Sequence, residues 1–160
     1  MKHVENMQSA INLVSLMGKN ACIRTIMIDE QNPEKFMLGV STPSNTFHLV
    51  EHWGDNARQM GEVKFFSDSF AKLDSRLKPI MDVVSSDDRI PTFTELYSVV
   101  TEAMMQTGIN PAEYINKGIY SESLSVGYSK DGWDHDTEID KGEFFKTYPV
   151  TEPNVFETNE

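Results

Sequence analysis

The feature that most constrains the fold of this chain is a change in the spacing of its apolar residues near residue 120. Before that point, apolar residues recur mainly at the three- and four-residue intervals of helices that bury one face. After it, "YSESLSVGYS" (120–129) and "WDHDTEI" (133–139) alternate residue by residue, which is typical of strands. The sequence therefore predicts helices in the first part of the chain and a strand-rich last part.

The first part also contains a predicted hairpin. A helical pattern over residues 4–16 ends near Gly18, a residue that commonly follows a helix. "ACIRTIMI" and "FMLGVST" lie on either side of the turn cluster "DEQNPEK", which predicts two paired strands. "TFHLVEHW" fits a third strand or a short helix, and the strand is favoured.

Three more helices are predicted from their capping residues. Ser67 is a good N-cap for "DSFAKLDSRLKPIMDVV", in which Pro79 predicts a kink or a break. Thr92 and Glu95 match a capping box, and Gly108 can end the helix that they begin. In "NPAEYINK", proline follows asparagine at the first helical position, which predicts a short helix.

The last part reads as three strands. Asp131-Gly132 is a strong hairpin turn signal, and "DKGE" turns the chain again into "FFKTYPV". We therefore expect an α+β fold, with helices packed on antiparallel strands and a C-terminal three-stranded antiparallel meander. We expect a single domain over residues 1–150, in which 119–150 form an acidic meander, and a loose tail over 151–160.

The charge of the chain excludes several classes of partner. The formal net charge is −11, and residues 119–160 hold ten acids against three bases, a net of −7. Direct nucleic-acid binding and binding to an anionic membrane are disfavoured, because both depend on basic side chains. No apolar run is long enough to span a membrane, the N-terminal pattern with Glu5 fits an amphipathic helix and not a signal peptide, and Cys22 is the single cysteine. We therefore expect a cytoplasmic protein without a disulfide framework.

A row of acidic residues is the candidate binding surface. On the predicted strand, carboxylates occupy every second position and share one face; they are Asp134, Asp136, Glu138 and Asp140. Neighbours on such a row lie about 6.6 Å apart and repel by only about 0.6 kcal/mol in water, so the row is tolerable without any function. Two interpretations stay open: a solvated sheet face, or a surface for a basic groove that normally grips phosphates. Glu122 and Glu143 would extend the second, with Trp133 as a possible anchor.

One short string resembles a catalytic motif. His48, Glu51 and His52 form H-x-x-E-H, which resembles the inverzincin metalloprotease signature, in which two histidines bind zinc and the glutamate activates water. That chemistry requires a helix, whereas the favoured strand places Glu51 opposite both histidines. A calcium loop beginning at Asp134 would need glycine where Ile139 stands and glutamate where Phe145 stands. We therefore predict no catalytic residue, no metal and no cofactor.

In size, acidity and lack of a catalytic motif, the chain resembles the small acidic proteins that phages make to inhibit host proteins. The targets of such proteins include restriction enzymes, polymerases and ATP-dependent proteases. The resemblance implies a non-enzymatic inhibitor or modulator that binds a protein with a basic surface, in some cases by mimicking DNA. The alternatives are a small zinc hydrolase using the H-x-x-E-H string and a structural subunit of a larger assembly, and the oligomeric state stays open.

Overall fold

The computed structural model describes residues 2–18, 21–29, 35–41, 47–53, 60–86, 92–115, 118–129 and 135–150. Its elements are, in chain order, α1 (Lys2–Ser15), β1 (Cys22–Asp29), β2 (Lys35–Ser41), β3 (Phe47–Trp53), α2 (Met60–Leu73), η1 (Ser75–Leu77), α3 (Lys78–Ser86), α4 (Phe93–Gln106), η2 (Pro111–Tyr114), β4 (Tyr120–Ser129), β5 (His135–Ile139) and α5 (Lys141–Thr147). The elements η1 and η2 are short 3-10 helices.

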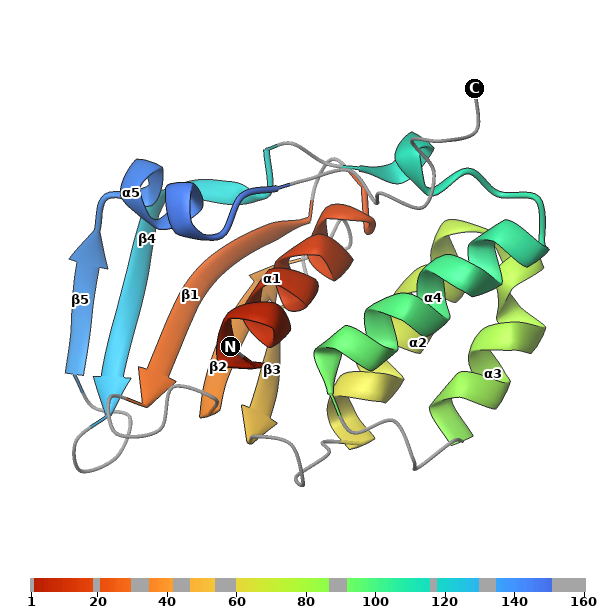
Figure 1. Ribbon diagram of the computed structural model, residues 1–160, viewed down its shortest axis with the longest axis horizontal. Coiled ribbons are helices and arrows are strands. Elements are labelled where there is room, and N and C mark those ends of the chain that lie inside the picture. Colours follow the sequence, from red (N-terminus) through yellow and green to blue (C-terminus); the bar gives the residue numbers. More distant parts are fainter. Residues whose placement is uncertain are drawn as a thin grey trace.

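The strands form one five-stranded sheet in the order β3-β2-β1-β4-β5. β1 pairs antiparallel with β2, β2 with β3, and β4 with β5, whereas β1 and β4 are parallel neighbours. Parallel neighbours need a long connection, and here β2, β3 and the helices α2 to α4 lie between β1 and β4 in the chain. In Figure 1, α1 lies across the sheet, α2, α3 and α4 form a group beyond β3, and α5 lies near β4.

The predicted fold class is wrong in its sheet. The strands are not all antiparallel, because β4 joins β1 in parallel, and the described residues contain no three-stranded C-terminal meander. The expected third strand, 144–150, is largely the helix α5. Asp140 begins this helix by accepting a 2.8 Å hydrogen bond from the Gly142 N–H. A Cβ at position 142 would lie 3.0 Å from Asp140 Oδ1, so glycine leaves room for this cap.

Several other predicted elements are confirmed. α1 covers the first helical pattern, β1 and β2 form the hairpin, and β3 is a strand. The Thr92 side chain accepts from the Glu95 N–H at the start of α4, and Gly108 follows that helix at φ 81°. The tail 151–160 and the turn at Asp131-Gly132 lie outside the described residues, and the single-domain organisation stays a prediction.

The second helix was placed wrongly. Ser67 does not cap it; α2 begins at Met60, and Ser67 is buried in its middle. Val63 and Phe66 continue the helical spacing of Phe70 backward past the predicted start, so the buried face is longer than the capping signal suggested. The chain breaks at Asp74, where η1 begins, before the expected kink at Pro79.

α1 is buried on nearly every side. Among residues 6–17, all are buried except Gln8 and Asn12. A helix that is apolar on one stripe only would leave its opposite face in water, so this degree of burial requires packing partners on more than one side. The buried apolar residues of α1 belong to one core cluster with residues of β1, β2, α2 and α4.

An aromatic cluster joins the sheet to the helical group. The Phe36 ring of β2 stacks on Phe93 of α4 at a centroid distance of 5.6 Å, and Phe66 of α2 meets Phe93 edge-on at 5.9 Å. All three side chains are at most 1% exposed. Such pairs stabilise by about 0.5–1.5 kcal/mol beyond the area that they bury. The cluster therefore fixes how α2 and α4 sit against β2.

A polar link fixes α1 to the first turn of α4. The side-chain oxygen of buried Asn6 accepts from the Thr94 backbone N–H and from the Thr94 hydroxyl, both at 3.3 Å. The Ser9 hydroxyl donates to the Thr94 hydroxyl oxygen, also at 3.3 Å. The first N–H groups of a helix have no partner within it, so Asn6 caps α4 from a neighbouring helix.

Asn6→Ala should lower the free energy of unfolding by about 1–3 kcal/mol, because it leaves the part-buried N–H and hydroxyl of Thr94 without their acceptor. Urea denaturation measures this change. Asn12→Ala is the matched control, because Asn12 is only partly buried and bonds with Gln8 one turn away in the same helix. Equal losses in the two variants would contradict the capping role of Asn6.

Candidate functional site

The candidate surface lies at the β5 edge of the sheet. β5 is the outermost strand beside β4, and it pairs Asp136 with Gly127 and Glu138 with Ser125. Trp133 and Asp134 lie outside the described residues. The structure therefore places two of the four predicted row members on an edge strand, where one side of the backbone has no neighbouring strand.

Asp140 and Glu143 belong to α5 and not to the strand. Asp140 is the N-cap of α5, and Glu143 in its first turn forms an ion pair with Lys146 at 3.2 Å. The Glu143 and Lys146 side chains are 72% and 76% exposed, so solvent screens this pair and it contributes little to stability. Acidic side chains in the first turn are favourable with the helix dipole, which gives both residues a structural role.

The backbone brings these acids to one end of the sheet. Asp136, Glu138, Asp140 and Glu143 follow one another from β5 into α5. Glu122 lies on β4, two residues before Leu124, which pairs with Ile139 at the end of β5. In residues 135–150 these four acids stand beside two bases, Lys141 and Lys146. The edge is thus acidic overall, but Lys141 and Lys146 place positive charge at both ends of α5.

The H-x-x-E-H string has no helical geometry. It lies on β3, where His48, Glu51 and His52 pair with Val40, Met37 and Phe36 of β2. A zinc site of that kind needs the two histidines one helical turn apart, and a strand does not provide this arrangement. In the described part of the chain, no group of three or more His, Cys, Asp or Glu side chains is placed to hold a metal ion.

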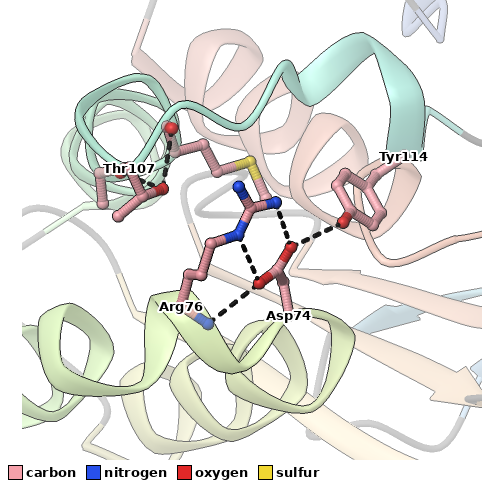
Figure 2. A network of polar contacts seen from close by, with 6 residues as sticks. Asp74, Arg76, Thr107 and Tyr114 are labelled. Atoms are coloured by element: carbon pink, nitrogen blue, oxygen red, sulfur yellow. Dashed lines mark hydrogen bonds and ion pairs between the residues drawn. The ribbon is translucent and has the colours of Figure 1, made fainter.

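A polar network that sequence reasoning missed joins the end of α2 to η2 (Figure 2). Arg76 donates through Nε and Nη2 to the two oxygens of Asp74, at 3.0 and 2.7 Å. The Asp74 carboxylate also accepts from the Arg76 backbone N–H at 3.0 Å and from the Tyr114 hydroxyl at 3.3 Å. Asp74 and Arg76 are near in sequence, but no local signal places Tyr114 beside them.

This network holds Asp74 in its charged form. The hydrogen bonds and charge of Arg76 lower the pKa of Asp74 far below the ordinary 3.8. Burial and the nearby Asp74 charge raise the pKa of Tyr114. A carboxylate with so low a pKa is a poor general base near neutral pH, and it already accepts several hydrogen bonds. The arrangement is therefore a structural clamp between α2 and η2.

Two buried hydroxyls lack hydrogen-bond partners. Among the described residues, Ser67 Oγ of α2 and Tyr97 Oη of α4 are buried without one. Burial raises the pKa of Tyr97 to about 12, because the charged phenolate would lose its hydration. Unpartnered buried hydroxyls destabilise a fold, so each marks a position that can be improved.

None of the helices in the part of the chain that the structure describes combines the length and apolar character needed to cross a bilayer. No known protein family matches this chain, and neither curated proteins nor solved structures give a significant match.

Tyr97→Phe should keep or raise stability at neutral pH, because it removes a hydroxyl without a partner. The unfolded chain loses the Tyr97 proton near pH 10 and the folded chain near 12, so stability falls between these values as the pH rises. The variant should lose less stability than the wild type in this window, as measured by urea unfolding at each pH. An identical pH profile would contradict the assignment.

Asp74→Asn keeps an oxygen that can accept from the Arg76 N–H but removes the charge. Because the folded pKa of Asp74 is depressed, its contribution is present above pH 3.8 and is lost as the pH falls below that value. The difference in melting temperature between wild type and variant should shrink on acidification. Asp82→Asn is the control, since Asp82 forms an exposed pair with Lys78. A pH-independent gap for Asp74→Asn would count against the clamp.

Proposed function

We propose that this protein acts by binding another protein that carries a basic surface or groove, and that it thereby alters or blocks the activity of that partner. It does so without catalysis, metal or cofactor, in the cytoplasm. The contact surface is the acidic edge formed by β5 and the start of α5. It comprises Asp136, Glu138, Asp140 and Glu143, with Glu122, Asp134 and Trp133 as its extensions.

The observation that carries this proposal is the position of β5 at the edge of the sheet. A row of charges in the centre of a sheet would face covering elements, whereas an edge strand can approach another molecule directly. Carboxylates at alternate positions along such an edge give a partner regularly spaced negative charge. A groove that binds phosphates could accept this spacing, because it is built to meet ordered anions.

The acids of the edge are not equally suited to a test by substitution. Asp140 already accepts the Gly142 N–H, so its replacement would also disturb α5. Glu143 shares its charge with Lys146. Asp136 and Glu138 lie within β5 and not at the start of a helix, and they are the residues at which the proposal is best tested. Partners of suitable chemistry include DNA-binding enzymes, polymerases and ATP-dependent proteases, and an origin in a phage would fit this range of targets.

The double variant Asp136→Lys with Glu138→Lys should lose its partner while it keeps its fold. The tagged protein is used to capture proteins from a lysate of the source cell, or of the host, at about 50 mM and about 200 mM salt, and these are identified by mass spectrometry. The wild type should recover a salt-sensitive partner, because a steered contact weakens as salt screens the charges. Circular dichroism checks the fold.

The matched control reverses two exposed acids outside the acidic edge. Glu5 lies on α1 and Asp68 on α2, and Glu5→Lys with Asp68→Lys makes the same change in net charge. The control should retain the partner. Binding that survives the β5 reversals, or that is lost equally in both double variants, would leave the acidic edge as a solvated face.

A further inference from the structure

An apolar groove lies between α3 and α4, at the end of the molecule opposite β5 (Figure 1). Its volume is about 410 Å³. Aliphatic side chains make most of the wall, and two polar residues stand on the α4 side; the lining is Pro79, Ile80, Val83, Val84, Val99, Glu102, Ala103 and Gln106. This surface is separate from the acidic edge and does not depend on the function proposed for it.

The groove exposes apolar surface that folding normally removes from water. Val84 and Ala103 are 5% and 3% exposed, whereas Val83 is 67% exposed. Among the described residues, the large hydrophobic side chains with this kind of exposure are Val83 and Met105, which is 47% exposed and does not line the groove. Single exposed hydrophobic residues are ordinary, but Val83 continues an apolar wall, and continuous apolar surface is typical of binding sites.

One rim of the groove is negatively charged. Glu95, Val99, Glu102 and Gln106 follow one another at helical spacing and form a single stripe along α4. Glu95 and Glu102 are exposed, and neither forms an ion pair with any residue that the structure describes. Residues 92–115 carry three acids and no base. On the other rim, the charge of Lys78 is already paired with Asp82 at 3.3 Å.

We infer that this groove binds an amphipathic helix of a partner protein, with its apolar stripe on the α3–α4 wall and lysine or arginine side chains opposite Glu95 and Glu102. Two helices that flank an apolar groove form the usual receptor for such a segment. The nine residues of α3 and fourteen of α4 extend for roughly 13 and 21 Å, which matches a partner helix of about 9–14 residues.

The negative charge of the groove rim favours a basic helix over a second copy of the chain as the occupant of the groove. A symmetric contact through the same groove would bring the unpaired Glu95 and Glu102 of one copy toward those of the other. α4 offers no base to compensate them, and each copy carries a net charge of −11. A basic amphipathic helix meets the same surface with opposite charge.

The probe is a synthetic peptide of roughly 14 residues with leucines at helical spacing and lysines on both flanks. Its binding to the full chain is followed by fluorescence anisotropy, and methyl NMR locates it. An otherwise identical peptide with glutamate in place of lysine is the control for charge. The lysine peptide should bind and shift the methyl signals of Val83, Val84, Val99 and Ala103, and the glutamate peptide should bind at least about tenfold more weakly.

Protein variants separate the groove from general attraction to an acidic chain. Val83→Gln and Glu102→Lys should each weaken binding of the lysine peptide by about tenfold, because they alter the apolar wall and the charged rim. Met105→Gln and Glu5→Lys are the matched controls, since both residues are exposed and lie outside both the groove and the acidic edge. These controls should change the affinity by less than about twofold.

Three results would overturn the inference. The first is equal weakening by the groove variants and their controls, which would indicate nonspecific attraction. The second is an absence of binding or of groove methyl shifts. The third is a dimer, seen by analytical ultracentrifugation, that Val83→Gln dissociates, because a second copy would then occupy the groove. These results do not involve β5, so failure here is distinguishable from failure of the proposed function.

Discussion

The burial of α1 is the constraint on which the rest of the structure depends. The helix is enclosed on nearly all sides, so it must pack against the sheet and against α4 at the same time. Asn6 makes this contact specific, because it supplies an acceptor that the first turn of α4 lacks. The cluster of Phe36, Phe66 and Phe93 adds a second connection between sheet and helices.

This arrangement leaves two ends of the molecule with distinct chemistry. At one end, β5 is an edge strand whose acids continue into α5. At the other, α3 and α4 flank an apolar groove with an acidic rim. α4 contacts α1, but Val83 and Glu102 at the groove are exposed and lie outside the core cluster that encloses α1. That separation makes mutational tests of binding informative.

Local sequence signals predicted an element correctly where they were compatible with one type of secondary structure only. The Thr92 cap and Gly108 defined α4 from both ends, and a turn cluster between β-branched segments defined the β1–β2 hairpin. In "FFKTYPV", however, Phe144 and Tyr148 fit both alternation and helical spacing. Packing resolves the ambiguity: Phe144 is buried, and the two rings lie 4.9 Å apart on a helix that Asp140 caps.

Other features could not be predicted from neighbouring residues in the sequence. The parallel pairing of β1 with β4 joins segments that are separated in the chain by β2, β3 and the helices α2 to α4, and no residue pattern in either strand specifies it. The Asp74–Arg76 pair is visible as neighbouring opposite charges, but its contact with Tyr114 depends on how α2 and η2 pack. Within the predicted row of acids, Asp140 proved to be a helix cap, which alternation alone cannot show.

Hydrogen–deuterium exchange on the complex recovered at low salt tests the central claim most directly, because it locates the contact surface without a substitution. The proposed function predicts that binding slows amide exchange in β5 and at the start of α5 and leaves the slowly exchanging amides of α1 unchanged. Protection confined to other elements, with β5 exchanging as in the free protein, would contradict the claim that the acidic edge is where this protein meets its partner.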